Sequence, residues 1–450
     1  MTFSPAGTTT GDWFMQIIIF VLMAYPIVGG CAFIVSAVYY HCFLERHDRP
    51  RYLARGEPFI TILVPAHNEE EEIAGTVHWL ENQLNYPAGQ YEIIVVDDAS
   101  TDRTGSILAD LQRRYPGNLR VITIVKNRGK AHAFNVAIAY AKGDFLLSND
   151  ADTKPNPDAL WQYMSYFERE GGQNVGAVTG NMLAANRTTL VALAQFNELN
   201  SIIGLIKRSQ MSYGGLFAFS GANTMYRKQA VLDVGGWHAE QPTEDIAISW
   251  DMQTAGWRAL FAPAIRFFLD CPEGLGMLLK QRRRWSSGGI YVLLTKSAGL
   301  LKHPVRNFRT MPIIFDYGLS VVWSFLYWIS LALFLISQVY FASRGNWERF
   351  DHNWYMVGIF VAIEMVVGTV QLALSSFFND RGRSMKYLLF APWYMLVYWM
   401  VNTWTVCVEF VPTTRKVLAH RDGGMWKSPA RSRSLHDVQL DRGNHRDPAA

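Results

Sequence analysis

Long apolar runs limit this chain to folds that cross a membrane. Residues 13–40, 317–343 and 387–408 contain no Asp, Glu, Lys or Arg, and residues 355–377 contain one charge, Glu364. Each run is long enough for a spanning helix, which needs about 20 residues. Trp and Tyr near the ends of these runs suit the membrane interface. Buried core helices are the alternative, and these lengths favour membrane spans over them.

The charges around the first run predict its orientation. Asp12 precedes it, and Arg46, Arg49, Arg51 and Arg55 follow it. Positive charge collects on the cytoplasmic side of a span, so we expect the residues after this helix to be cytoplasmic. A cleaved signal is not expected, because no basic segment precedes the run and the run is too long for a signal's apolar part.

Composition excludes several other classes of protein. Only 18% of the residues are charged, whereas about a quarter is usual in soluble proteins. The net charge of +4 comes mostly from basic residues beside the apolar runs, so we expect no nucleic-acid partner. The spacing of the four cysteines predicts neither a zinc site nor a disulfide framework. They are Cys31, Cys42, Cys271 and Cys407.

Residues 58–262 alternate between apolar strands and helices. The expected strands are 59–64, 91–96, 119–125, 144–148 and 175–180. The acidic run 69–72 is expected to open a helix, because negative charge suits a helix N-terminus, and further helices are expected at 106–114, 131–141 and 158–168. Such alternation predicts an α/β fold with a mainly parallel sheet covered on both faces. Ligands of these sheets bind beyond the carboxyl ends of the strands, which here are Pro65, Asp97 and Asn149 onward.

Two further segments concern the membrane. Residues 288–309 mix Leu, Ile and Val with Lys and Arg, which predicts a helix at the membrane surface, with an ordinary amphipathic surface helix as the alternative. The tail after Pro412 is basic, with eight Lys or Arg against four Asp. Three full C-terminal crossings would leave this tail outside the cell. Either one of these runs is interfacial or re-entrant, or the number of crossings is not three. Run 387–408 is the one most in question, because it contains Pro392 and several polar residues.

Carboxylates follow two of the expected strands. Asp97 and Asp98 end the second strand and suit hydrogen bonds from a base or a ribose, although a helix cap by Ser100 or Asp102 is an alternative use of this segment. Asp150 and Asp152 follow the fourth strand. In an extended segment both point the same way. That arrangement suits Mg²⁺ or Mn²⁺ bridged to a diphosphate.

Two motifs lie at expected helix starts. Lys130 comes directly before a helix, a place that favours phosphate, although a lysine in a solvent-exposed loop is the plain alternative. Glu244 and Asp245 open a second amphipathic segment. Acids there are ordinary helix caps. With a metal site predicted on the same sheet edge, Asp245 becomes a candidate general base.

Residues 281–285 read Gln-Arg-Arg-Arg-Trp and precede the C-terminal apolar runs. The planar fork of arginine binds phosphate, and an indole face can stack on a sugar ring. An arginine-rich membrane flank with an interfacial tryptophan is the alternative. Arg282 and Arg283 fit that alternative as well as they fit a binding role.

Taken in order, these motifs resemble the processive family 2 glycosyltransferases, which include cellulose, chitin, hyaluronan and poly-N-acetylglucosamine synthases. The resemblance covers residues 58 to about 301, and the membrane segments resemble most the poly-β-1,6-N-acetylglucosamine synthases of bacterial biofilms. Residues 286–289 read Ser-Ser-Gly-Gly, where that group more often has Ala-Gln-Gly-Gly. The motifs are Pro65-Ala66-His67-Asn68-Glu69, Asp97-Asp98, Gly129-Lys130-Ala131, Asp150-Ala151-Asp152, Thr243-Glu244-Asp245 and Gln281-x-x-Arg284-Trp285.

The resemblance implies a GT-A (Rossmann-like) α/β domain that transfers N-acetylglucosamine from UDP-GlcNAc with inversion at the anomeric carbon. Asp245 would be the base, and Asp150 and Asp152 would hold Mg²⁺ or Mn²⁺. The donor site would comprise Pro65, Ala66, Asn68, Glu69, Asp97, Asp98, Lys130, Asp150, Ala151 and Asp152. The acceptor and diphosphate site would comprise Gly221, Glu244, Gln281, Arg284 and Trp285.

The resemblance also implies an organisation and partners. The segments would be an N-terminal segment (1–12), a membrane helix (13–44), the cytoplasmic GT-A domain (45–287), an interfacial segment (288–310), a C-terminal membrane region (311–411) and a basic cytoplasmic tail (412–450). The protein would be located in a bacterial inner membrane. Its partners would be a UDP-sugar, a growing polysaccharide, lipid and a small membrane subunit with cyclic di-GMP regulation.

Two alternatives stay open from the sequence. A chitin-, hyaluronan- or cellulose-type synthase uses the same motifs, and a non-catalytic membrane component of polysaccharide export would share the membrane helices. Charged residues in or near the membrane are expected to face protein or a cavity, because lipid cannot solvate them. These are Asp316, Glu364 and Glu409.

Overall fold

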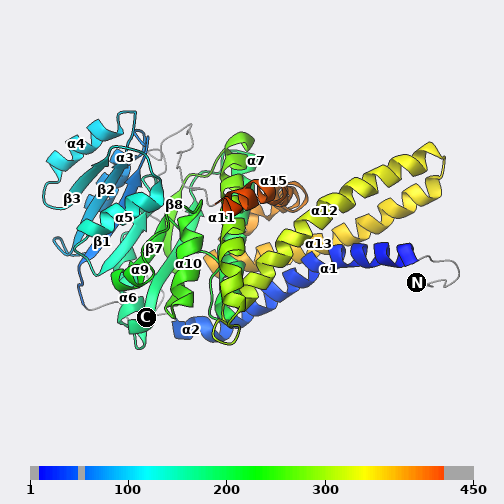
Figure 1. The fold of residues 1–450 in the computed structure, drawn as a ribbon, viewed down its shortest axis with the longest axis horizontal. Coiled ribbons are helices and arrows are strands. Elements are labelled where there is room, and N and C mark those ends of the chain that lie inside the picture. Colours follow the sequence, from blue (N-terminus) through cyan, green and yellow to red (C-terminus); the bar gives the residue numbers. More distant parts are fainter. Residues whose placement is uncertain (1–9, 49–55, 420–450) are drawn as a thin grey trace. The chain divides into compact units, whose positions relative to one another are not determined.

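The chain forms two compact units in the computed structural model, which describes residues 10–48 and 56–419 (Figure 1). The sheet unit comprises Asp48–Leu199 and Phe217–Leu278, and the helical unit comprises Met1–His47, Asn200–Leu216 and Leu279–His420. Arg49, Arg51, Arg55 and almost all of the predicted basic tail lie outside the described residues.

The sheet unit contains one eight-stranded sheet with the order β3-β2-β1-β4-β7-β6-β8-β5. The strands are β1 (Ile60–Ala66), β2 (Tyr91–Asp98), β3 (Leu119–Ile124), β4 (Phe145–Asn149), β5 (Lys154–Pro155), β6 (Val175–Ala184), β7 (Asn223–Arg227) and β8 (Arg258–Leu269). Every residue of β1 and β2 is buried, which explains why their sequences are almost continuously apolar.

The first four strands form the parallel part that the sequence predicts. β1 pairs in parallel with β2 and β4, and β2 pairs in parallel with β3. β7 then lies antiparallel between β4 and β6, and β8 runs parallel to β6. The sequence did not predict β5, β7 or β8. β7 reads Asn-Thr-Met-Tyr-Arg, a polar pattern that does not resemble the other buried strands.

Helices cover the parallel strands as expected from right-handed crossovers. The helices of this unit are α3 (Ile73–Asn82), α4 (Thr104–Arg114), α5 (Lys130–Tyr140), α6 (Ala159–Glu168), a short 3₁₀ turn η2 (Gly172–Asn174), α7 (Leu190–Ser201), α9 (Lys228–Asp233) and α10 (Glu244–Thr254). α3 and α4 contact each other, while α5 packs on β1 and β2. Because the strand order reverses after β3, α5 lies on the opposite face from α3 and α4.

The helical unit consists of long helices with irregular joints. Its elements are α1 (Thr10–Tyr39), the π-helical segment η1 (Tyr40–Leu44), α2 (Glu45–Asp48), η3 (Ile202–Ile206), α8 (Lys207–Ser212), α11 (Leu275–Leu301), α12 (Met311–Ser343), α13 (Trp347–Asp380), η4 (Arg383–Phe390), α14 (Ala391–Trp393), η5 (Tyr394–Tyr398) and α15 (Trp399–Leu418). Inside this unit α1 contacts α8, α12 and α13, and α12 contacts α15.

Three helices among the described residues are long and apolar enough to cross a membrane: Ala24–Asp48, Met311–Ser343 and Trp347–Asp380. Large apolar side chains on them are exposed, including Val35 at 67%, Ile336 at 65% and Val366 at 64%. In water such exposure would be unfavourable, whereas in lipid it is the expected state of a spanning helix.

The last apolar run, 387–408, differs from the others. The structure divides it among η4, α14, η5 and the first half of α15, and it is not one of the three long apolar helices. Pro392 removes a backbone donor there, and α15 buries the polar Thr403, Thr405 and Glu409. α15 continues to Leu418, past the boundary that we expected at residue 412.

The helical segment predicted over 288–309 ends early. α11 stops at Leu301, and turns occupy residues 302–310. Pro304 explains this end, because proline disfavours the helical conformation of the residue before it.

A buried ion pair connects distant parts of the helical unit. The Arg208 Nε lies 3.0 Å from the Glu45 Oε2, and the two side chains are 1% and 3% exposed. Arg208 also donates hydrogen bonds to the Gly204 carbonyl at 3.0 Å and to Asn379 Oδ1 at 3.1 Å. His41 contacts the same Glu45 oxygen at 2.6 Å. Each of these charges is therefore compensated inside the unit.

Candidate active site

The carboxyl ends of β1, β2 and β4 meet at one edge of the sheet. Ala66 pairs in register with Asp97, and β4 ends next to β1 at Asn149. The predicted polar residues after these strands therefore share one edge, as parallel pairing requires.

The two carboxylates at the end of β2 hold the adjacent loops. Asp98 is fully buried and accepts hydrogen bonds from the backbone N–H groups of Arg128, at 3.1 Å, and Gly129, at 2.8 Å. Gly129 has φ +90°, a conformation that favours glycine. Asp97 accepts a bond from the Ser100 N–H at 3.0 Å. Asp98 therefore holds the loop before α5, and Asp97 holds the turn before α4.

The loop after β1 is bonded to the loop after β2. Asn68 adopts the left-handed conformation, with φ 56°, and its Oδ1 accepts a bond from the Thr101 N–H at 2.7 Å. The Asn68 N–H in turn donates to the Ser100 hydroxyl at 3.0 Å. The sequence indicated Ser100 only as a possible helix cap, whereas its hydroxyl accepts a hydrogen bond from the loop after β1.

Asp102 is a loop anchor, close to the capping role considered from the sequence. Its carboxylate accepts bonds from the Thr104 N–H at 2.9 Å and the Glu70 N–H at 3.2 Å. Burial opposes ionisation of Asp102. The hydrogen bonds from Thr104 and Glu70 outweigh burial and hold the pKa of this carboxyl below its usual value.

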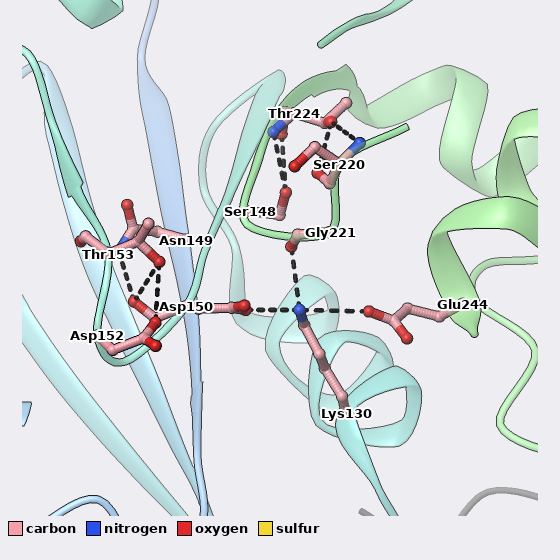
Figure 2. A network of polar contacts seen from close by, with 10 residues as sticks. All are labelled: Lys130, Ser148, Asn149, Asp150, Asp152, Thr153, Ser220, Gly221, Thr224 and Glu244. Carbon is pink, nitrogen blue, oxygen red and sulfur yellow. Dashed lines mark hydrogen bonds and ion pairs between the residues drawn. The ribbon is translucent and has the colours of Figure 1, made fainter. Parts of the chain in front are cut away.

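Lys130 lies at the centre of the site (Figure 2). Its Nζ is 2.5 Å from Asp150 Oδ1, 3.3 Å from Glu244 Oε1 and 3.1 Å from the carbonyl oxygen of Gly221. Its side chain is 10% exposed, so the alternative of a solvent-exposed loop lysine is wrong. Burial alone would lower the pKa of the ammonium, but Asp150, Glu244 and Asp245 together raise it, and Lys130 is charged.

The residues between Asp150 and Asp152 form a turn. The Thr153 N–H donates to the Asp150 carbonyl at 3.1 Å, and the Thr153 hydroxyl donates to Asp152 Oδ1 at 3.2 Å. The expectation of an extended segment was therefore wrong, because the chain turns here toward β5. The Asp150 carboxylate points at Lys130 (Figure 2).

The charges of this turn are close enough to interact. Although 36% of the Asp150 side chain is exposed, burial raises the pKa of its carboxyl; Lys130 opposes this shift and Asp152 adds to it. Within residues 10–48 and 56–419, no group of three or more His, Cys, Asp or Glu side chains is arranged to hold a metal ion.

Glu244 and Asp245 open α10, as predicted. The Ile246 N–H donates to Asp245 Oδ1 at 2.9 Å, and Glu244 bonds to Lys130. A Cβ placed on Gly221 would lie 3.1 Å from Glu244 Oε1 and 3.4 Å from Asp245 Oδ2. The two acids therefore face the Gly221 backbone and are not simple caps.

The carboxylates at the start of α10 also affect the pKa of Tyr226, a buried residue of β7. Burial, and then the negative charges of Asp245 and Glu244, raise the pKa of Tyr226. This buried phenol is thus held neutral beneath the site.

Buried hydroxyl groups position the loop that carries Gly221, and the sequence did not predict them. The Thr224 hydroxyl donates to the Ser220 carbonyl at 2.7 Å, and its Oγ1 lies 3.1 Å from Thr179 Oγ1. The Thr224 N–H donates to Ser148 Oγ at 3.2 Å (Figure 2 draws Ser148, Ser220 and Thr224). Ser148, Thr179 and Thr224, which carry these hydroxyls, are buried strand residues. A hydroxyl residue inside an otherwise apolar strand was the available signal.

The Gln281–Trp285 motif lies on α11 in the helical unit. The Arg282 guanidinium carbon is 4.2 Å from the centroid of the Trp285 ring, and the Arg282 side chain is buried. Arg283 pairs with Glu409 of α15. Neither arginine is therefore a plain membrane flank, and Glu409 faces protein as expected.

The residues after this motif join α11 to α15. Ser286 Oγ lies 2.9 Å from Thr405 Oγ1, and Ser287 Oγ lies 2.9 Å from Thr413 Oγ1. All four hydroxyls are buried. The Ser-Ser pair at this position is thus matched by threonines on the facing helix.

Known proteins resemble both the sequence and the fold. The chain is 31% identical over 416 residues to the poly-beta-1,6-N-acetyl-D-glucosamine synthase of Staphylococcus aureus, a match covering 91% of this chain and 97% of that protein. The family model described as Glycosyl transferase family 2 matches residues 61–235. This chain belongs to glycosyl transferase family 2.

Two further proteins resemble the chain, one in sequence and one in fold. The poly-beta-1,6-N-acetyl-D-glucosamine synthase of Staphylococcus epidermidis is 30% identical over 419 residues, with 91% of this chain and 97% of that protein covered. The solved mannosyltransferase PcManGT from Pyrobaculum calidifontis, in complex with GDP-Man and Mn²⁺, is 19% identical and has a TM-score of 0.54. The match covers 88% of this chain and 99% of the mannosyltransferase. The family 2 chain has the GT-A, Rossmann-like fold and is a glycosyltransferase.

Proposed function

We propose that this glycosyltransferase polymerises N-acetylglucosamine from UDP-GlcNAc into β-1,6-linked poly-N-acetylglucosamine, working processively and with inversion. The observation that carries the proposal is the ion cluster in which Lys130 joins Asp150 to Glu244. In this cluster the Lys130 ammonium contacts Asp150, from the motif proposed for the donor. It also contacts Glu244, at the start of the helix that carries the proposed base, Asp245. The matched relatives named as poly-β-1,6-N-acetylglucosamine synthases support the choice of sugar and linkage.

The donor site is assigned to the sheet edge. The residues proposed to hold the UDP-sugar are Pro65, Ala66, Asn68, Glu69, Asp97, Asp98, Lys130, Asp150, Ala151 and Asp152. A phosphate-bearing ligand suits this edge because it combines a buried cation with the start of α5.

A divalent cation fits the chemistry of the Asp150–Asp152 turn. Mg²⁺ and Mn²⁺ prefer oxygen ligands, and Mg²⁺ is usually held by one or two carboxylates together with substrate phosphates and water. Asp150 and Asp152 supply two carboxylates to this turn. When bound, the cation would neutralise charge on the departing diphosphate.

Catalysis is assigned to Asp245. It takes the proton from the acceptor hydroxyl, and the oxygen attacks the anomeric carbon of the α-linked donor from the face opposite the diphosphate. The bond to UDP breaks, and one displacement gives a β-linkage. The residues proposed for the acceptor and diphosphate are Gly221, Glu244, Gln281, Arg284 and Trp285, and an acceptor sugar stacked on Trp285 would stay bound between additions.

The helical unit supports a membrane location with the sheet unit in the cytoplasm. One span before the sheet unit and two after it, α12 and α13, return the chain to the side of the sheet unit after Asp380. This arrangement puts Arg46 and the basic η4 on that same side, as positive charge prefers. The irregular run 387–408 would then lie at the interface, which removes the conflict with a cytoplasmic tail. A bacterial inner membrane is the proposed site.

The test is the identity of the product. Membranes containing the chain are incubated with radiolabelled UDP-GlcNAc or UDP-glucose, and the polymer is digested with a β-1,6-specific N-acetylglucosaminidase or with chitinase. We expect incorporation from UDP-GlcNAc and release by the β-1,6-specific enzyme. Digestion by chitinase would favour a chitin-type synthase, incorporation of glucose a cellulose-type synthase, and no incorporation an export component.

A further inference from the structure

The site contains more negative than positive side chains. Asp150, Glu244 and Asp245 all interact with the Lys130 ammonium, and Asp152 interacts with Asp150. The Lys130 ammonium therefore interacts with three of these carboxylates. The 2.5 Å contact makes Asp150 the nearest partner of that charge.

The contact with Lys130 has a consequence for a metal ion. The Asp150 carboxylate, which would help to hold a divalent cation, is the group against which the ammonium lies. Two positive charges at one carboxylate repel each other, and the site is partly shielded from water. A cation at Asp150 therefore competes with Lys130.

Lys130 in turn loses its nearest anion when it leaves Asp150. Its side chain is 10% exposed, and a buried ammonium is unfavourable unless negative charge compensates it. Glu244 remains at 3.3 Å but lies farther from Nζ than Asp150 does. A diphosphate bound at the same sheet edge would replace the negative charge of Asp150 beside the ammonium and would also attract the metal.

We propose that Lys130 is a built-in counter-ion of Asp150 that a nucleoside diphosphate draws away, so that a divalent cation and the diphosphate bind cooperatively. The inference rests on the proposed nucleotide-sugar donor. Metal alone binds weakly because it has to displace Lys130. The diphosphate accepts Lys130, and by thermodynamic reciprocity each ligand then strengthens the binding of the other.

The experiment measures Mn²⁺ binding to the purified, detergent-solubilised chain by electron paramagnetic resonance, with and without UDP. For the unmodified chain we expect UDP to tighten Mn²⁺ binding about tenfold or more, within the range of 5- to 150-fold usual for coupled sites. In Lys130→Gln we expect Mn²⁺ alone to bind about tenfold more tightly, and the effect of UDP to shrink toward none. Lys130→Arg, which keeps the charge, should keep the coupling.

A second variant, Asp150→Asn, keeps the buried cation, and we expect it to strengthen the binding of UDP. In the proposed donor site Asp150 would hold the diphosphate through the cation, so without metal Asp150→Asn removes only the carboxylate nearest to the ammonium. UDP measured by calorimetry in EDTA should therefore bind more tightly to this variant than to the unmodified chain. Thermal unfolding midpoints of both variants check that the fold persists.

Each outcome separates the inference from the proposed function. Lys130→Gln that binds Mn²⁺ alone no more tightly, with the UDP effect intact, overturns the counter-ion role. So does unchanged or weaker binding of UDP to Asp150→Asn in EDTA. Cooperative Mn²⁺ and UDP binding without any polymer from UDP-GlcNAc would instead overturn the proposed function and leave the counter-ion role standing.

Discussion

Arg282 covers one face of Trp285, with its guanidinium carbon 4.2 Å from the ring centroid. The same guanidinium lies 5.8 Å from the ring centroid of Tyr398 in η5. The buried Arg282 cation therefore packs against the indole from the same helix, and the acceptor sugar that we propose would stack on the other face of the ring.

The first prediction concerns this pair. Arg282→Met should loosen the indole and shorten the polymer, because a buried cation–π contact contributes about 0.5–2 kcal/mol, or about 2- to 30-fold in acceptor binding. Trp285→Ala should shorten the product further, and Trp285→Phe should restore part of its length. Product size is measured by gel filtration of radiolabelled polymer, and UDP binding should stay unchanged. Arg306→Met, an exposed arginine of the same unit, is the control. Equal losses of donor binding and polymer length in Trp285→Ala would exclude acceptor stacking.

The second prediction concerns the base. Asp245→Asn keeps the oxygen that accepts the Ile246 N–H, so the start of α10 should persist. Transfer and UDP release should fall by about 100- to 10,000-fold, the usual contribution of a general base, while UDP still binds. Turnover is measured by UDP release from membranes. Asp158→Asn, on the exposed surface of the sheet unit, should retain full activity. Normal turnover of Asp245→Asn would remove this residue from catalysis.

The third prediction tests how tightly the site is packed. A Cβ at Gly221 would lie 3.0 Å from Lys130 Nζ and 3.1 Å from Glu244 Oε1, so Gly221→Ala must shift one of these charged groups. At these distances the charged group has to yield by only a few tenths of an ångström, so we expect a loss in kcat that is smaller than the about 100-fold cost of a displacement of about 1 Å. Gly117→Ala, whose Cβ would meet nothing within 4 Å, is the matched control. If both alanine variants turn over alike, the contacts around Gly221 do not restrict the reaction.

The fourth prediction concerns the stability of the helical unit. Arg208→Met breaks the buried ion pair with Glu45, which should destabilise the fold by about 3–5 kcal/mol. Adding Glu45→Gln should recover part of the loss, because the buried carboxylate that has lost its arginine is then replaced by a neutral amide. The thermal midpoint of the detergent-purified chain, followed by size-exclusion fluorescence, measures both.

The control for this prediction is a pair at the surface. Arg103 is 81% exposed beside Glu70, and Arg103→Met should change stability by about 1 kcal/mol or less. A similar small effect of Arg208→Met would show that water reaches the Glu45–Arg208 pair.

The sequence predicted the parts of the fold that depend on local pattern. β1, β2 and β4 could be found because strands buried on both faces must be almost continuously apolar. The spanning helices could be found because lipid demands long apolar runs. β7 escaped prediction because its residues are polar and its place between β4 and β6 comes from pairing with two distant strands.

From the sequence alone we could also predict that the polar residues after β1, β2 and β4 share one edge, because the carboxyl ends of parallel strands meet there. The tertiary structure decided what those side chains do to one another. Lys130, Asp150, Gly221 and Glu244 are far apart in the chain, and no local pattern tells that one ammonium contacts all three partners. The same holds for Arg282, whose burial against Trp285 depends on the packing of α11. Charge–charge and stacking energies depend on distance and burial, and only the folded chain sets these.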